Sequence, residues 1–287
     1  MINKILNMEN GKVNSYVINE SEKSPEIYFS HANGFNALTY SSLLKKIKKN
    51  YQITSYDMRG HGETTLLADH NQMRSWLIYK DDLEQILDIK KTPSVLIGHS
   101  MGGTASLLLS YARPDLVSQL ILIDPVILSY SYRIIYKFLQ KAGLMKIHPM
   151  VRGALMRRNT WKNQNEAVEY FERKKLFRNI SKNIIEDYVT DGLRKNIHQK
   201  YELSCHPEWE AANFRLSPDE IGFNLKKSNI PIKLILPPNS YVCNKESQRK
   251  LERLMPNIEI VNIKNTSHML PLENFEAVSD EINKFLI

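Results

Sequence analysis

The sequence predicts an α/β protein: a mostly parallel, doubly wound sheet with a helical cap inserted before the penultimate strand. Two observations carry this prediction. Short apolar runs alternate with helix-length segments, as expected for parallel strands covered by helices on both faces, and residues 129–228 then show helical character with no strand pattern. The apolar runs are Ile27–Ser30, Tyr51–Tyr56, Ser94–Ile97, Leu120–Ile123, Ile232–Leu236 and Ile258–Ile263.

A β-hairpin is predicted ahead of these strands. Asn10-Gly11 is a strong two-residue turn signal, and it lies between the extended runs Ile2–Met8 and Lys12–Asn19. Helical periodicity is clearest directly after Ser100 and at the end of the chain, where apolar stripes should pack on the sheet. The stripes consist of Ala105, Leu108, Leu109 and Ala112, and of Phe275, Val278, Ile282 and Phe285.

The stretch 129–228 is too long for a single crossover helix and is interpreted as an insertion above the sheet. The predicted division is a core made of residues 1–128 and 229–287, and a cap, or lid, made of residues 129–228. Aromatic and methionine side chains of the cap either fill its interior or form the apolar wall of a pocket. They include Tyr130, Tyr132, Tyr136, Phe138, Met150, Met156 and Trp161.

Composition favours an ordinary globular protein, with 42% hydrophobic and 24% charged residues and a net charge of +8. Basic residues are concentrated in 45–49 and 152–200, and acidic residues are interspersed in the second stretch, as on solvated helix faces. We therefore expect no nucleic-acid partner, and attraction to acidic substrates is the alternative.

No segment resembles a secretory signal or reaches the length of a transmembrane helix, so the expected location is the cytoplasm. Cys205 and Cys243 are expected to be free thiols, because their separation fits neither a metal cluster nor a disulfide framework. A homodimer is left open.

The strongest chemical signal is SVLIGHSMGG, residues 94–103, in which an apolar strand leads into G-x-S-x-G and then a helix. Small residues on both sides of Ser100 permit a strained turn that lifts its hydroxyl off the sheet. The helix that follows favours a developing anion, and the amide of Met101 is a candidate oxyanion donor. Ser100 is therefore the predicted nucleophile.

Other polar loops follow the predicted strands. HANGF, residues 31–35, is the expected source of a second oxyanion donor, because a tetrahedral oxyanion needs two. DMRGHGET, residues 57–64, is interpreted as structural, with Asp57 and Arg59 bracing a glycine-shaped loop. His268 follows the last apolar run and is the predicted general base for Ser100.

Together, HANGF, DMRGHGET, GHSMGG, LILIDPV and NTSHMLPLEN resemble the α/β-hydrolase fold family across the chain outside its helical insertion. The resemblance implies that Ser100 and His268 are nucleophile and base, and that the amide of Asn33 is the second oxyanion donor. Ala32 stands where the usual motif has glycine, so Phe35 is the alternative donor. Phe35 and His99 are also predicted to contact the substrate.

The acid that orients His268 is the least determined part. In the commonest family pattern a glycine and an aspartate follow the strand before the histidine loop, but here that strand is followed by PPNSY. Asp124, at the carboxyl end of the strand after the nucleophile helix, is the predicted acid, and Glu246 is the reserve candidate. The alternative role for Asp124 is to cap the turn before Pro125.

These features predict a serine hydrolase that cleaves a small-molecule carboxylic ester or a related acyl bond, such as a thioester or lactone, without metal or organic cofactor. Carbon–carbon bond hydrolysis and haloperoxidase-like activity are alternatives within the family. A different class is a non-catalytic ligand-binding protein on a hydrolase scaffold, because no carboxylate occupies the commonest position of the acid.

Overall fold

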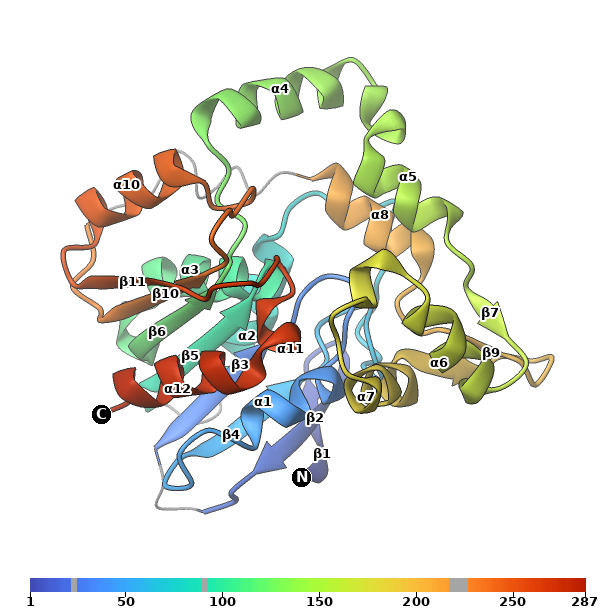
Figure 1. Cartoon of the computed structure of the whole chain (residues 1–287), viewed down its shortest axis with the longest axis horizontal. Coiled ribbons are helices and arrows are strands. Elements are labelled where there is room, and N and C mark those ends of the chain that lie inside the picture. Colours follow the sequence, from blue (N-terminus) through green and yellow to red (C-terminus); the bar gives the residue numbers. More distant parts are fainter. Residues whose placement is uncertain (22–24, 89–91, 217–226) are drawn as a thin grey trace.

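The computed structural model describes residues 1–21, 25–88, 92–216 and 227–287. Its centre is an eight-stranded sheet with the order β1-β2-β4-β3-β5-β6-β10-β11 (Figure 1). The pairs β1–β2 and β2–β4 are antiparallel and the remaining pairs are parallel. The strands are β1 (Ile2–Met8), β2 (Gly11–Ile18), β3 (Glu26–Ser30), β4 (Gln52–Tyr56), β5 (Ser94–His99), β6 (Val117–Ile123), β10 (Ile232–Leu236) and β11 (Ile258–Asn262). All six predicted parallel strands are therefore present, and the α/β fold class is confirmed.

The N-terminal hairpin turns one residue earlier than predicted. Met8 pairs with Gly11, so the two turn residues are Glu9 and Asn10. Gly11 is the first residue of β2 and has a φ of 143°. A Cβ at this position would lie 3.1 Å from the Thr65 carbonyl oxygen, so the glycine serves a close approach of two segments as well as the turn.

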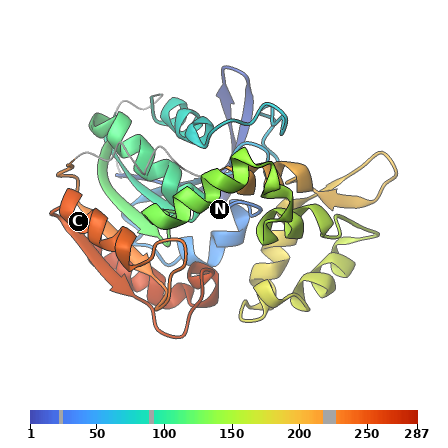
Figure 2. The ribbon, with the colours of Figure 1, turned by 90° about the horizontal axis from the view of Figure 1, so that it is seen from above.

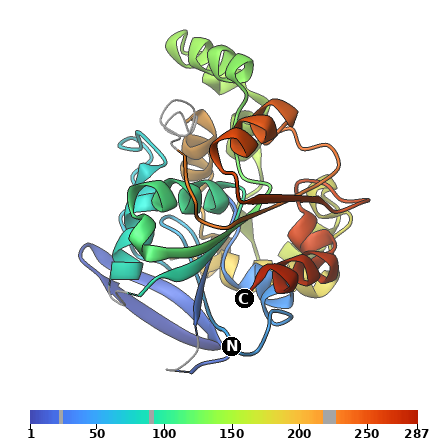
Figure 3. The ribbon, with the colours of Figure 1, turned by 90° about the vertical axis from the view of Figure 1, so that its left-hand side faces the viewer.

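Helices cover both faces of the sheet (Figure 3). Two apolar cores result, and alternate residues of β5 and β6 belong to opposite cores, as expected for strands buried on both sides. The first core includes α1 (Ser41–Leu44), α11 (Leu270–Glu273) and α12 (Phe275–Phe285). The second includes α2 (Leu77–Asp88), α3 (Met101–Ala112) and α10 (Lys245–Leu254). The predicted helices after Ser100 and at the end of the chain correspond to α3 and α12.

Between β6 and β10 the chain forms a separate layer of helices, which we call the inserted segment (described residues 129–216). Figures 1 and 2 show it on one side of the sheet. Its helices are α4 (Tyr130–Lys141), α5 (Pro149–Met156), α6 (Gln164–Glu172), α7 (Lys182–Gly192) and α8 (Pro207–Arg215). Short 3₁₀ turns of this segment are Leu144–Ile147 and Lys175–Phe177, and two more in the core are Leu38–Tyr40 and Pro114–Leu116. Residues 217–226 of the predicted cap lie outside the described residues.

The expectation that this segment lacks strands was wrong. It contains a small antiparallel sheet with the order β7-β9-β8, formed by β7 (Thr160–Trp161), β8 (Leu193–Lys195) and β9 (Tyr201–Leu203). These strands have only two or three residues each. A two-residue alternation cannot be recognised over so short a length, so the apolar pattern carried no strand signal.

None of the helices in the described ranges combines the length and the apolar character needed to cross a bilayer.

A buried pair of carboxyl groups lies where the inserted segment meets the core. Asp191 of α7 is buried and accepts a hydrogen bond of 2.8 Å from the Tyr16 hydroxyl. Burial, and to a smaller extent the nearby carboxylate of Asp57, raises the pKa of Asp191 to about 8. Asp57 itself accepts hydrogen bonds from the Ala37 and Glu63 amides and the Asn14 side chain. Asp191 therefore holds a proton at neutral pH in the folded protein.

This proton makes stability depend on pH. An unfolded aspartate has a pKa of about 3.9, so folding retains a proton between roughly pH 4 and the folded pKa of about 8. The free energy of unfolding should fall as the pH rises through this window. Asp191→Asn should remove that slope. The difference in melting temperature between the variant and the wild type should therefore be several degrees more favourable to the variant at pH 8 than at pH 5. The exposed Asp81→Asn is the control, and an unchanged slope in Asp191→Asn would contradict the assignment.

Candidate active site

The nucleophile elbow is a strained turn between β5 and α3. Ser100 has φ 54° and ψ −117°, and its amide donates a hydrogen bond of 3.0 Å to the Ile123 carbonyl. A Cβ at Gly102 would lie 2.2 Å from the Ser30 carbonyl oxygen, and one at Gly98 would lie 2.5 Å from the Gly102 backbone. Glycine at both positions therefore lets the elbow pack against its own helix and the neighbouring strand.

Three predicted residues meet at the carboxyl ends of the strands. His268 Nε2 lies 2.9 Å from Ser100 Oγ, and His268 Nδ1 lies 2.7 Å from Asp124 Oδ2. Asp124 accepts only, so we assign the Nδ1 proton to the hydrogen bond with Asp124 and leave Nε2 to accept from the serine hydroxyl. This is the tautomer that a general base for Ser100 requires.

Asp124 is held by groups from β6 and from the loop after β10. It is fully buried, its φ is 39°, and its amide donates to the Ile235 carbonyl. The Ser240 hydroxyl donates to the second carboxylate oxygen at 2.5 Å and accepts from the Cys243 amide. The sequence analysis did not assign this role to Ser240, although Ser240 lies in the loop where the commonest pattern carries its acid.

Glu246, the reserve candidate for the acid, lies elsewhere. Its carboxylate accepts a hydrogen bond of 2.9 Å from the Tyr130 amide at the start of α4. A carboxylate at the N-terminus of a helix is stabilised by the helix dipole and the free amides there. This contact accounts for Glu246 without a role beside His268.

The two predicted oxyanion donors border the same pocket as Ser100. Three neighbouring amides of the loop already have acceptors. The Ala32 amide donates to Tyr40 Oη, the Gly34 amide to His61 Nε2, and the Phe35 amide to the Ala32 carbonyl. For the Asn33 amide, the described part of the chain supplies no acceptor. Asn33 and Met101 both line the pocket, which suits two amides that converge on an oxyanion. Phe35, the alternative donor, is excluded because its amide closes a turn.

Neither residue predicted to contact substrate, Phe35 or His99, lines the pocket. Phe35 is buried and packs against Tyr40, Phe177 and Tyr188, because the turn after Ala32 directs it into the contact with the inserted segment. His99 is fully buried beneath the elbow, where residues of β5 alternate between the two faces of the sheet. These two predictions are corrected.

The histidines and the arginine of the motif loops have structural partners. His31 accepts from the Met58 amide and donates to the Ala32 carbonyl, and His61 accepts from the Gly34 amide and donates to the Arg59 carbonyl. Burial lowers the pKa of both imidazoles, so both are neutral and fit these hydrogen bonds. Arg59 pairs with Asp82. These residues hold the loops that carry Asn33.

A hydrogen-bonded chain that the sequence analysis missed connects the loop at residues 31–35 to His268. The Tyr40 hydroxyl accepts from the Ala32 amide and donates to His99 Nδ1 at 2.7 Å, and His99 Nε2 donates to the His268 carbonyl at 2.9 Å. Burial lowers the pKa of His99 well below its usual range, so its ring is neutral and suits this direction of donation. Tyr40 and His99 are positioning residues for His268.

Tyr40→Phe tests this chain with little change of volume. It leaves the buried His99 Nδ1 and Ala32 amide without a partner, at a cost of about 1–3 kcal/mol. We expect kcat for a soluble ester to fall by about ten-fold, because His268 is displaced from Ser100. KM should be nearly unchanged, because the residues that line the pocket do not move. Tyr51→Phe, which removes a buried hydroxyl that donates to the Ile287 carbonyl, is the matched control. Equal kcat in both variants would argue against the chain.

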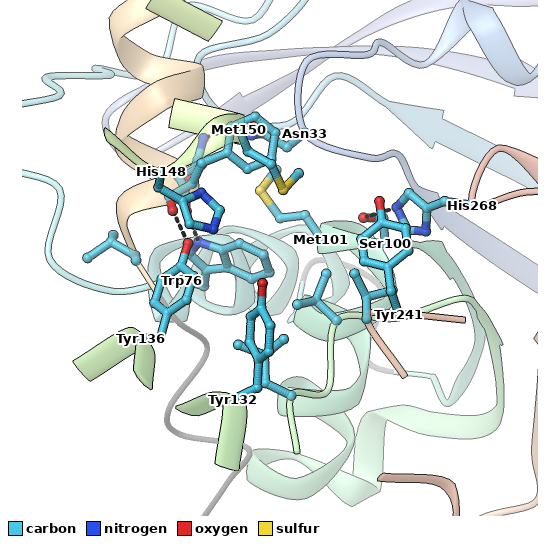
Figure 4. Close-up of a pocket in the computed structure, with 16 residues that line it drawn as sticks. Asn33, Trp76, Ser100, Met101, Tyr132, Tyr136, His148, Met150, Tyr241 and His268 are labelled. Carbon is cyan, nitrogen blue, oxygen red and sulfur yellow. Dashed lines mark hydrogen bonds between the residues drawn. The ribbon is translucent and has the colours of Figure 1, made fainter. Parts of the chain in front are cut away.

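The pocket above Ser100 is mainly apolar and encloses about 80 Å³ of free space. Figure 4 shows Ser100 and His268 at one end and Trp76, Tyr136 and His148 at the other. Core and inserted segment both contribute to its wall, which also includes Met101, Val126, Leu128, Tyr132, Met150, Asn213, Phe214, Leu216, Tyr241 and Val242. The described residues that line it include no lysine, arginine or carboxylate. Aspartate, glutamate, histidine and cysteine side chains in the described ranges form no group of three arranged to hold a metal ion.

Comparison with known proteins places the chain in a family. Residues 27–281 match the model of the alpha/beta hydrolase family, so the chain belongs to this family. An (E)-2-((N-methylformamido)methylene)succinate hydrolase from Acinetobacter baylyi is 31% identical over 126 residues, which are 44% of this chain and 46% of that protein. An sn-1-specific diacylglycerol lipase from Mus musculus is 24% identical over 91% of this chain and 81% of its own length.

Solved structures show the same fold. A thioesterase domain from the curacin biosynthetic pathway superposes with a TM-score of 0.78 at 16% identity, covering 98% of this chain and 99% of that one. An E-2-(acetamidomethylene)succinate hydrolase gives a TM-score of 0.76 at 18% identity over 99% of this chain and 98% of that one. The named relatives are hydrolases of one superfamily with differing substrates.

Proposed function

We propose that this protein is a serine hydrolase that cleaves a carboxylic ester or a related acyl bond through Ser100, His268 and Asp124. The observation that carries the proposal is the continuous hydrogen-bonded chain from Asp124 through His268 to Ser100, which ends at an apolar pocket. We further propose that residues 129–228 act as a cap that shapes this pocket. The cytoplasmic location and the homodimer stay predictions from the sequence.

In the proposed reaction, His268 Nε2 accepts the hydroxyl proton while Ser100 Oγ attacks the acyl carbon. The amides of Met101 and Asn33 stabilise the oxyanion, and Asp124 stabilises the imidazolium. Collapse of the tetrahedral intermediate leaves an acyl-serine, and His268 returns the proton to the departing alcohol or thiol. Water, deprotonated by the same imidazole, then releases the acid and restores the serine.

The lining of the pocket supports a neutral acyl group as substrate. A dicarboxylate such as the succinate derivatives of two relatives would require cationic partners in a buried site, and the described lining offers none. The alternative that the net positive charge attracts acidic substrates is therefore not favoured at this site. Apolar walls instead fit an alkyl or aryl chain.

A panel of 4-nitrophenyl acetate, butyrate, hexanoate and octanoate, with matching thioesters, tests this proposal. Met150→Trp should reduce kcat/KM for the longer chains by about ten-fold while sparing acetate, because Met150 lies between the two ends of the pocket (Figure 4). An exposed methionine away from the pocket, Met156→Trp, is the control. A uniform loss over the panel would contradict the assignment of this pocket to the acyl chain.

The binding-protein alternative loses its main support, because Asp124 supplies a carboxylate beside His268. A fluorophosphonate probe separates the two classes. Labelling of Ser100 supports an activated nucleophile, and a lack of labelling in the folded protein supports a ligand-binding role. Carbon–carbon bond hydrolysis would use the same residues, and the ester panel together with a β-diketone substrate distinguishes it.

A further inference from the structure

The helix α4 has an unusual orientation: its apolar stripe faces outward. Tyr130, Ile134 and Phe138 recur at every fourth position and have exposed fractions of 59%, 51% and 65%. The opposite face is mixed: Tyr136 is buried in a small apolar cluster with α5 and α8, Arg133 is buried, and Gln140 donates to the Arg215 carbonyl. A surface helix normally turns its apolar stripe to the core. Figures 1 and 3 show α4 clear of the sheet and of the helices that flank it.

The apolar surface extends beyond α4. Ten of the nineteen exposed large apolar side chains in the described residues lie between residues 130 and 156, among them Ile135, Ile147 and Met156 at 56%, 68% and 70% exposure. We call residues 130–156 the outer arm. Concentration in one region distinguishes these side chains from the scattered exposed apolar residues that most proteins carry, and it indicates an interaction surface.

The charge of the same region indicates the kind of partner. Residues 129–158 contain seven lysines and arginines and no aspartate or glutamate. Arg157 and Arg158 form ion pairs with Glu210 and Glu166, whereas Lys141, Lys146 and Arg152 are exposed on the outer arm. Two apposed copies of this surface would bring like charges together. An anionic surface would complement it.

We propose that the outer arm docks on the surface of a lipid bilayer or lipid aggregate with anionic headgroups. Apolar side chains along one helix face, flanked by basic residues, are the features that hold a helix in the plane of a lipid interface. Lysines near such a surface add electrostatic attraction to it. This docking does not depend on the chemistry proposed at Ser100.

Its consequence for catalysis does rest on the proposed function. Tyr132 and Met150 belong to the outer arm, are 46% and 40% exposed, and also line the pocket above Ser100. A docked molecule therefore places its pocket next to the apolar phase, from which an ester dissolved in the lipid can enter. We expect esters presented in anionic vesicles to be better substrates than the same esters in neutral vesicles.

Vesicle sedimentation of the full chain tests the docking. Vesicles of phosphatidylcholine with phosphatidylglycerol should bind it, and vesicles of phosphatidylcholine alone should bind it at least about ten-fold more weakly. The Ile134→Ser, Phe138→Ser double variant should lose about ten-fold or more in binding, because two large apolar side chains no longer enter the interface. Leu176→Ser with Ile197→Ser, which are exposed at 50% and 90% outside the outer arm, is the matched control.

A charge-reversal pair and two readouts complete the design. Lys141→Glu with Lys146→Glu should weaken binding to the anionic vesicles by at least about ten-fold, and Lys195→Glu with Lys200→Glu should not. Hydrolysis of a soluble short ester should be unchanged in all four double variants. Ser100→Ala should bind vesicles as the wild type does, so docking and catalysis are judged separately.

Binding that ignores lipid charge, or that survives the outer-arm substitutions, would overturn the proposal. So would a dimer in analytical ultracentrifugation that Ile134→Ser with Phe138→Ser dissociates, together with no vesicle binding; the apolar face would then belong to a second copy. If the protein binds the vesicles as expected but the wild type hydrolyses none of the esters, the proposed function is contradicted and the docking surface is supported.

Discussion

Ser100→Ala should reduce the hydrolysis of activated esters by on the order of a thousand-fold or more. The substitution removes the hydroxyl oxygen that lies 2.9 Å from His268 Nε2, whereas the amides of Met101 and Asn33 remain and should sustain a small residual rate. The fold should persist, since alanine meets the same backbone strain at φ 54° that serine meets. The measurement is kcat for 4-nitrophenyl butyrate, together with the loss of fluorophosphonate labelling.

Ser106→Ala is the matched control for this experiment. Ser106 is also a buried serine of α3, and its hydroxyl donates to the Gly102 carbonyl at 2.9 Å. Removing it takes one hydrogen bond from the same helix without touching the pocket. Turnover near that of the wild type in Ser100→Ala would refute the proposed mechanism, whatever the control shows.

Asp124→Asn should reduce turnover by about ten-thousand-fold, the cost of the corresponding change in a serine protease. An amide in place of the carboxylate accepts or donates with equal ease, so it permits the wrong tautomer of His268 and leaves the imidazolium unsupported. Ser240 Oγ, 2.5 Å from Asp124 Oδ1, can still donate to the amide oxygen, so the loop should hold its shape. Thermal unfolding should accordingly change far less than kcat.

Glu246→Gln distinguishes this acid from the reserve candidate. Its carboxylate accepts from the Tyr130 amide, and the glutamine oxygen retains that contact with loss of only the interaction with the helix dipole. We expect a change in kcat of about two-fold or less and a loss of stability below about 1 kcal/mol. A large loss with Glu246→Gln and a small one with Asp124→Asn would transfer the acid to Glu246.

Local patterns in the sequence were sufficient for the strands of the sheet, for the helices α3 and α12, and for the elbow around Ser100. Each of these depends on residues that are close in the chain: apolar runs of strand length, a helical stripe, and glycines on both sides of a serine. The same patterns did not predict the register of the N-terminal hairpin, nor the strands of two or three residues in the inserted segment. Pairing partners, which are distant in sequence, decide those features.

The acid shows most clearly where local information ends. Asp124 and His268 are 144 residues apart, and they meet at 2.7 Å because β6, β10 and β11 run parallel side by side, so the loops after β6 and β11 leave at the same edge of the sheet. The sequence by itself left Asp124 and Glu246 as candidates, since both follow a buried element and carry a carboxylate. Only the tertiary structure decides between their positions, because it places Glu246 at the start of α4.

The aromatic and methionine residues of the inserted segment divide in the same way. From composition a buried interior was the favoured role for them, with a pocket wall as the alternative. In the structure Trp161 is buried, Tyr136 and Met150 line the pocket, and Tyr130 and Phe138 face outward. The sequence indicated that these side chains are apolar and helical in spacing. The packing of α4 against α8, through the buried Tyr136 and the hydrogen bond of Gln140, decided which of them face outward. The reason is that the sequence shows which residues share one side of a helix, whereas the neighbouring elements decide which side packs against the protein and which faces solvent.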